Sequence, residues 1–239
     1  MNKKLFALAA FCAVFVCSVF GADAGSKVMP EFSDSKTIVC GSKKVVLSAD
    51  GKLSVANASG EILNVSLQYI FKESASGKVD WFTCTPEICK MSQDGKKVVW
   101  EIWKKHDLHT WKVADQTLEI LEDGQLKLSA KIINPETDKI VPRLPYASFF
   151  IFFPIAENDG KKMLYNDQEY ILSANVKGVS AWRGPRFDYE LFPGNPAETV
   201  IFKSSKIEQT GSIKVGPNHR IAYIFPKDGC GEILIDLRK

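Results

Sequence analysis

Five Asp-Gly pairs divide this chain of 239 residues into short segments, and they constrain its fold more than any other feature. Asp-Gly supplies the positive φ angles that tight hairpin turns require. The pairs stand at positions 50/51, 94/95, 123/124, 159/160 and 228/229. Two of them, Asp50-Gly51 and Asp123-Gly124, join adjacent alternating runs directly. This pattern predicts a series of antiparallel strands.

Three segments alternate apolar and polar residues with a period of two. Leu63 to Phe71 is the clearest, and Leu126 to Ile132 and Ile233 to Leu237 follow the same pattern. This period places one apolar face of each strand on a core. Tyr146 to Phe153 is instead a continuous apolar run rich in aromatic residues, which predicts a strand buried on both faces.

Helical periodicity is weak throughout the chain. No window of 12 or more residues sustains it, and the nearest candidate, His106 to Asp115, is short and mixed. Because exposed sheet faces must be covered, we predict an all-β fold in which two antiparallel sheets pack face to face as a single β-sandwich domain over residues 25–239.

The first 24 residues have the plan of a secretory signal peptide. Two lysines precede an apolar run from Leu5 to Phe20, and Ala22-Asp23-Ala24 offers a small-x-small cleavage site. The run has 16 residues, whereas a membrane-spanning helix needs roughly 20. We therefore expect a secreted or periplasmic protein with no membrane span after cleavage.

Net charge and motifs exclude several function classes. The chain has 31 Lys and Arg against 28 Asp and Glu, so no strong field favours nucleic acid as a partner. Gly41-Ser42-Lys43 lacks the upstream glycine of a phosphate loop, and no Gly-x-Ser-x-Gly is present. Nucleotide hydrolysis and serine esterase chemistry are thus disfavoured, and no cofactor is expected. The oligomeric state stays open.

Four cysteines remain after signal cleavage, and an exported chain tends to oxidise them. Cys84 and Cys89 flank a Pro-containing turn, while Cys40 and Cys230 lie near opposite ends of the chain. We favour disulfides that pair Cys84 with Cys89 and Cys40 with Cys230. The alternative is a zinc site of four thiolates, which the absence of a Cys-x-x-Cys pair disfavours.

Two of the three histidines stand together and form the best candidate for proton transfer. His106 and His109 flank Asp107, and Glu101 offers a second carboxylate nearby in sequence. A metal site would need a helical turn there and a third ligand, so none is predicted. Alternatively, His106 to His109 form a polar loop after the strand that ends near Lys105, without a role in catalysis. His219 follows a Gly-Pro pair by two positions, which predicts a solvated turn residue.

Tryptophans give a second signal, because sugars bind aromatic faces through their apolar C–H surfaces. Alternation along the strand places Trp100 in the core and leaves Trp103 exposed. Trp103, Trp111 and Trp182 are therefore candidate ligand contacts. The alternative is that they pack in an ordinary core.

The segment Lys177 to Ala197 is the most irregular part of the chain, and long loops in compact domains are often functional. It carries Arg183, Arg186, Asp188 and Glu190 among aromatic residues. The two arginines could bind a uronate or sulfate through paired hydrogen bonds. Alternatively, these charges pair internally and tie the loop down.

The segment Leu126 to Phe150, LKLSAKIINPETDKIVPRLPYASFF, resembles the central strands of the galactose mutarotase-like β-supersandwich family. Asn134-Pro135 and Pro145-Tyr146 carry the resemblance, which covers about one-eighth of the chain. In the mutarotases a histidine precedes the Pro-Tyr pair, but Leu144 stands there in this sequence. The resemblance therefore implies a supersandwich-like fold suited to sugars, without that family's catalytic histidine.

Fold, compartment and residue types agree on an exported, non-catalytic protein that binds a poly- or oligosaccharide. Two alternatives stay open. One is a sugar-active enzyme, an epimerase, lyase or hydrolase, that uses His106 or His109. The other is a structural or interaction module of the cell envelope without a small ligand.

Overall fold

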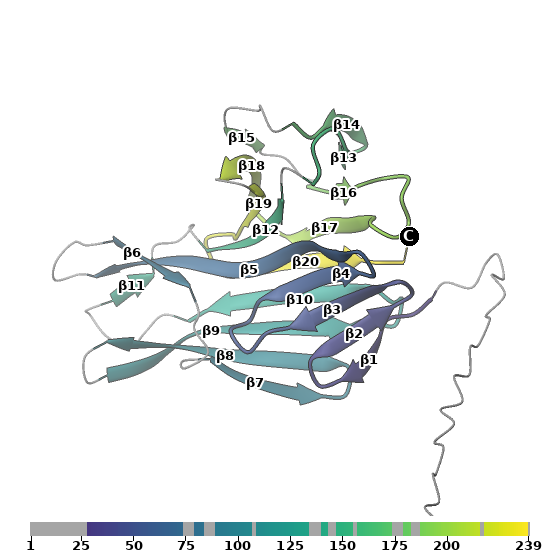
Figure 1. Cartoon of the computed structure of the whole chain (residues 1–239). Helices are drawn as coiled ribbons and strands as arrows, with labels where there is room; N and C mark the ends of the chain where they lie inside the picture. Colours follow the sequence, from purple (N-terminus) through teal and green to yellow (C-terminus); the bar gives the residue numbers. More distant parts are fainter. Residues whose placement is uncertain are drawn as a thin grey trace, which may run out of the picture.

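Two large antiparallel sheets pack face to face in the computed structural model, as the alternating segments predict (Figure 1). The structure describes residues 28–73, 79–83, 89–106, 109–133, 140–142, 147–154, 157–173, 179–182, 187–215 and 218–238. It contains strands and turns throughout this part and no helix. The predicted class, an all-β single-domain sandwich, is confirmed.

The first sheet has 11 strands, ordered β1-β2-β3-β4-β5-β12-β19-β18-β15, with β6 and β11 also paired to the long strand β5. Its strands are β1 (Glu31–Asp34), β2 (Thr37–Cys40), β3 (Lys43–Leu47), β4 (Leu53–Asn57), β5 (Gly60–Glu73), β6 (Val79–Thr83), β11 (Ile140–Pro142), β12 (Ser148–Pro154), β15 (Val179–Trp182), β18 (Gln209–Val215) and β19 (Asn218–Ile224).

The second sheet has nine strands, ordered β14-β13-β16-β17-β20-β10-β9-β8-β7. Its strands are β7 (Cys89–Asp94), β8 (Lys97–His106), β9 (His109–Ile120), β10 (Leu126–Ile132), β13 (Lys162–Tyr165), β14 (Gln168–Ile171), β16 (Tyr189–Leu191), β17 (Val200–Lys206) and β20 (Cys230–Asp236). The sheets exchange strands late in the chain, so β12, β15, β18 and β19 return to the first sheet while β13, β14, β16, β17 and β20 join the second.

One hydrophobic core joins the inner faces of both sheets. Leu63, Val65 and Leu67 of β5 are buried, as their alternation predicts, and β10 and β20 bury every second residue. Strand β12 lies between β5 and β19, and Ser148 to Ile151 are all buried. The prediction of a strand buried on both faces is thus confirmed for this stretch.

The glycines of all five Asp-Gly pairs adopt positive φ angles, which confirms the turn predictions. Gly51, with φ of 80°, has a second role. Its carbonyl oxygen accepts a 2.6 Å hydrogen bond from the buried amide of Gln116 on β9 of the other sheet. The β3–β4 turn is therefore anchored across the sandwich.

His219 contradicts the prediction of a solvated turn residue. It is the second residue of β19, is 5% exposed, and stacks on Phe153 with ring centroids 5.3 Å apart. Strand β19 begins at Asn218, directly after the Gly-Pro pair. The strand's alternation therefore turns His219 inward, on the same face as Ile221 and Tyr223.

The predicted disulfide between Cys40 and Cys230 is wrong, because both residues are free thiols. Cys40 is buried near the charged groups of Asp236 and Arg238, and burial raises the pKa of its thiol. Asp236 is the last residue of β20, and Cys230 is the first residue of that strand. Six residues of strand separate these ends by about 20 Å, far beyond the reach of a disulfide. Cys84 lies outside the described residues, so its pairing with Cys89 stays a prediction.

Peptide mapping without reduction tests this correction. We expect Cys40 and Cys230 in unlinked peptides, and we expect Cys40 to be alkylated more slowly than Cys230 because its thiol is buried and its pKa is raised. Unfolded protein, in which both thiols are accessible, is the control. A cross-linked peptide containing both cysteines would contradict the structure.

The predicted signal peptide, residues 1–24, lies outside the described residues, and export stays a prediction. Within the described part of the chain, no helix has the length and apolarity needed to cross a membrane.

Candidate functional site

The predicted catalytic cluster falls on the hairpin of β8 and β9. His106 and His109 are directly opposed in the register at the tip of this hairpin, so neither lies on a helical turn. Their side chains and all of Asp107 lie outside what the structure describes. Glu101 is described, and a hydrogen bond from Lys112 at 3.1 Å lowers its pKa and keeps it ionised. Proton transfer at this hairpin stays a prediction.

Trp103 projects from the outer face of the nine-stranded sheet, whereas Trp100 is fully buried, as alternation predicts. Trp103 is half-buried, and the ammonium of Lys90 lies 5.1 Å from the centroid of its ring. A cation thus occupies part of the surface on which a sugar would stack. The predicted contacts Trp111, Trp182, Arg183 and Arg186 have side chains outside the described residues.

The two described members of the predicted loop site, Asp188 and Glu190, lie together in a hollow of about 270 Å³ on the outer face of the nine-stranded sheet. Asp167, Lys203 and Asp236 also line it. The hollow therefore combines four carboxylates with one ammonium group.

Asp188 has structural partners in this hollow. Its carboxylate accepts the backbone N–H of Ser204 at 3.2 Å, and its own N–H donates to the side chain of Asn166. Asp236 is held by Arg238, which binds both carboxylate oxygens at 2.6 and 2.8 Å. The contacts of Asp188 favour the alternative that charged residues of the segment Lys177 to Ala197 hold it in place.

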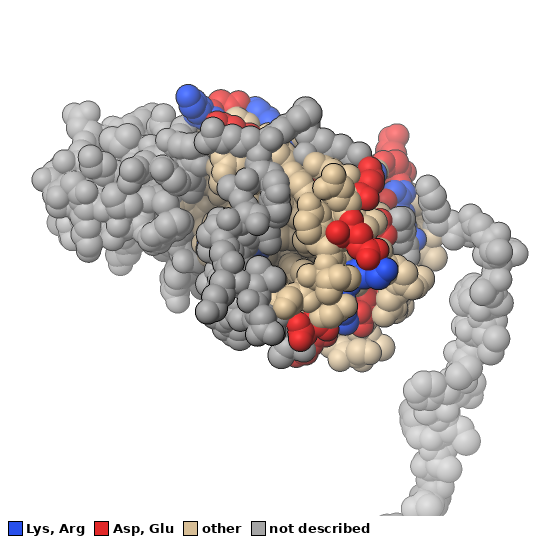
Figure 2. Space-filling model, turned by 90° about the horizontal axis from the view of Figure 1, so that it is seen from above, with Lys and Arg blue, Asp and Glu red and all other residues tan. Residues whose placement is uncertain are grey.

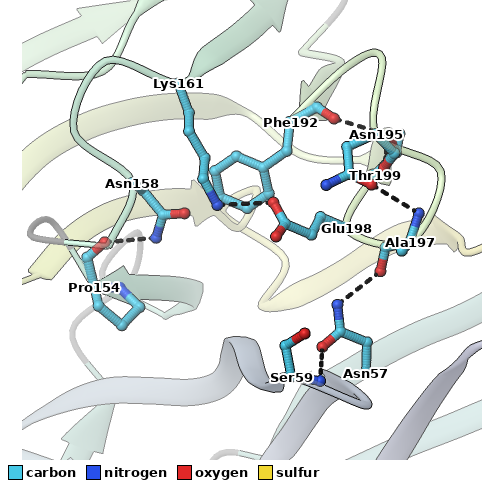
Figure 3. Close-up of polar contacts among 10 residues, drawn as sticks. All are labelled: Asn57, Ser59, Pro154, Asn158, Lys161, Phe192, Asn195, Ala197, Glu198 and Thr199. Carbon is cyan, nitrogen blue, oxygen red and sulfur yellow. Dashed lines mark hydrogen bonds and ion pairs between the residues drawn. The ribbon is translucent and has the colours of Figure 1, made fainter.

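A second hollow, which we call the end cleft, opens at one end of the sandwich and has a volume of about 240 Å³. It is lined from both sheets, by the β4–β5 turn and the start of β5, the β12–β13 loop, and the β16–β17 loop (Figure 3). Its lining residues are Asn57, Ser59, Gly60, Glu61, Ile62, Glu157, Asn158, Lys161 and Glu198.

Asn158 supplies a fixed polar group in the end cleft. The residue is only 4% exposed, and its side-chain N–H donates to the carbonyl oxygen of Pro154 at 2.6 Å. Its side-chain oxygen accepts no hydrogen bond from any residue that the structure describes. Figure 3 shows this oxygen turned toward Lys161 and Glu198. An acceptor held in this orientation is ready for a ligand's donor.

Lys161 and Glu198 form the wall between the end cleft and an adjoining hollow of about 280 Å³. Their charged groups are 2.7 Å apart, and the Lys161 ammonium also lies 5.0 Å from the centroid of Phe192. The adjoining hollow is lined further by Pro193 and Asn195. The two hollows together form a groove over the Lys161–Glu198 pair.

The β16–β17 loop is held rigidly beside this groove. Phe192 is 3% exposed and adopts a left-handed φ of 56°, which is unusual for a bulky side chain and costs about 1–3 kcal/mol. The buried hydroxyl of Thr199 lies 2.8 Å from the carbonyl oxygens of both Phe192 and Asn195. Asn57 donates to the carbonyl of Ala197 at 3.0 Å and ties the loop to the first sheet. Strain of this kind, held by surrounding contacts, is common at binding sites.

Sequence reasoning missed most of the end cleft. The irregular segment Lys177 to Ala197 indicates one wall of the end cleft, because its last residues belong to the β16–β17 loop. The turn that contains Asp159-Gly160 points to the second wall. Nothing in the local pattern indicates that these segments meet the β4–β5 turn.

No family model matches this chain, and no curated protein matches it. The site therefore has to be interpreted from its own geometry. Among the residues that the structure describes, no group of three or more His, Cys, Asp or Glu side chains could hold a metal ion.

Proposed function

We propose that this protein is exported and binds a poly- or oligosaccharide in the end cleft, without catalysis. The observation that carries the proposal is the nearly buried amide of Asn158, which is fixed by Pro154 and presents its oxygen to the cleft beside the Lys161–Glu198 pair. Sugar hydroxyls both donate and accept hydrogen bonds, so they match adjacent amide, carboxylate and ammonium groups.

The character of the lining supports a hydroxyl-rich ligand over an apolar one. Ile62 is the one large apolar residue that lines the end cleft in the described chain, and Phe192 and Pro193 add apolar surface in the adjoining hollow. Pockets for apolar small molecules are lined mainly by hydrophobic side chains. A mostly polar groove with a few apolar positions fits a sugar, which has hydroxyl edges and apolar C–H faces.

The resemblance of residues 126–150 to the mutarotase-like family supports the same ligand class. It remains a proposal, because the motifs Asn134-Pro135 and Pro145-Tyr146 lie outside the described residues. The groove's open shape between loops favours an oligosaccharide over a single enclosed sugar.

A glycan array of residues 25–239, followed by calorimetric titration with the best ligand, tests the proposal. Lys161→Met retains the apolar stem over Phe192 and removes the ammonium group. We expect it to weaken the binding of a neutral oligosaccharide by about tenfold, because a hydrogen bond to a charged group contributes about 1.5–3 kcal/mol. Lys227→Met, at an exposed position in the turn before β20, is the control and should bind normally.

Two results would overturn the proposal. One is a blank array with folded protein, which would favour an envelope interaction module. The other is binding by Lys161→Met that equals the unmodified protein's, which would place the carbohydrate site elsewhere.

A further inference from the structure

Carboxylates outnumber ammonium groups among the residues that line the end cleft, and some of its hydrogen-bond acceptors have no donor in the described chain. Three carboxylates, those of Glu61, Glu157 and Glu198, line it against the single ammonium of Lys161. Lys161 is already committed to Glu198 at 2.7 Å. Glu61 and Glu157 are thus the carboxylates that a ligand would meet with their charge uncompensated.

Neither of these two carboxylates pairs with a cation among the described residues. Glu61 accepts hydrogen bonds from neutral groups, the hydroxyl of Ser54 and the amide of Asn64. Glu157 is exposed at the rim and makes no hydrogen bond or ion pair within the described chain. Figure 2 shows acidic and basic side chains interspersed toward the right of the view, the side on which the β16–β17 loop lies in Figure 1.

Asn158 adds a neutral hydrogen-bond acceptor to the end cleft. This observation is separate from the excess of carboxylates over ammonium groups. Asn158 is only 4% exposed, and its unpartnered side-chain oxygen is turned into the cleft (Figure 3). This acceptor, adjacent to Glu157 in the chain, is available to a donor from the ligand. An ammonium group carries three donors and no acceptor, which matches these groups better than a hydroxyl does.

We propose that the end cleft selects amino sugars, with a protonated amine bound between Glu157 and Asn158 and attracted by Glu61. This inference rests on the proposed carbohydrate-binding function and specifies its ligand class. It differs from a uronate or sulfate bound by Arg183 and Arg186, because an anionic sugar would be repelled by Glu61 and Glu157.

Titration with two oligosaccharides of equal length tests the inference. One consists of glucosamine units and the other of N-acetylglucosamine units, so they differ in replacing an ammonium by an amide. We expect the glucosamine oligomer to bind at least about tenfold more tightly, which corresponds to about 1.4 kcal/mol. The preference should shrink as salt is added, because salt screens the exposed carboxylates.

Two variants assign the preference to the cleft. Glu157→Gln and Glu61→Gln keep side-chain volume and remove charge, and each should reduce the preference by several-fold, the scale of one partly exposed ion pair. The control is Glu208→Gln, an exposed carboxylate that follows β17 at the end opposite to Glu198. It should leave the preference unchanged.

The outcomes separate the two proposals. Equal or tighter binding of the acetylated oligomer would overturn the amino-sugar inference and leave carbohydrate binding intact. An undiminished preference in both Gln variants would also overturn it. Failure to bind any sugar, on the array and in titration, would overturn the proposed function itself.

Discussion

Replacing Trp100 by alanine is expected to lower the free energy of unfolding by about 3–5 kcal/mol. Its side chain is fully buried on β8 between the two sheets, and its indole N–H donates to the carbonyl oxygen of Ser48 at 3.0 Å. The substitution leaves a large cavity and removes a hydrogen bond that ties the second sheet to the β3–β4 turn. Urea unfolding followed by circular dichroism measures the loss.

Two further variants separate the causes. Trp100→Phe keeps most of the ring volume and removes the N–H, so its cost should be smaller, about 1–2 kcal/mol. Val99→Ala changes the adjacent residue, which lies on the outer face and is half-buried, and it should cost less than about 1 kcal/mol. Equal costs for Trp100→Ala and Val99→Ala would contradict the position of Trp100 in the core.

The second large effect is expected for Gly231→Ala on β20. A Cβ atom at this position would lie within 3.0 Å of three ring carbons of Phe225, which real Cβ atoms essentially never do. Phe225 is fully buried and packs edge to face against Phe149, with centroids 4.9 Å apart. The ring therefore has no free space into which to move. We expect a loss near 3 kcal/mol, the upper end of the usual cost of overpacking, about 1–3 kcal/mol.

A double-mutant cycle tests this explanation. Phe225→Leu removes part of the ring and should cost stability by itself. Combined with Gly231→Ala, it should cost less than the sum of the single changes, with a coupling of about 0.5–3 kcal/mol. Additive effects would show that the ring and the added methyl group do not collide.

The approach of Phe225 to Gly231 illustrates how the two sheets fit together. Phe225 follows β19 of the first sheet, and Gly231 lies on β20 of the second. The missing side chain lets a large aromatic ring lie against the backbone. Alternation on β20 predicts which face of this strand is buried, but it does not predict which residue of the other sheet lies above it.

The candidate site was less accessible to sequence reasoning than the fold. Asp188 and Glu190 do lie in one hollow, as their loop predicts, yet Asp188 holds the backbone of β17 in place. The end cleft contains neither residue. Its key group, Asn158, belongs to a turn that looks ordinary in the sequence and is distinguished by its burial and its hydrogen bond to Pro154.

The sequence by itself determined the fold class, the position of several strands and the turns between them. These are local properties, because a period of two depends on neighbouring residues and a positive φ depends on glycine. Trp100 was assigned to the core and the Asp-Gly pairs to turns on this basis, and the structure confirms both.

Only the tertiary structure decided which distant residues meet. The chain crosses between the two sheets several times, so the place of a residue in space depends on strand order and on the end of the strand at which it lies. Cys230 begins β20 and Cys40 lies near Asp236 at the other end of that strand, and no disulfide joins them. Conversely, Asn57 at the end of β4 and two loop residues, Asn158 and Glu198, line one cleft. Contacts between residues far apart in the sequence arise from the packing of whole sheets, and no local pattern of residues encodes them.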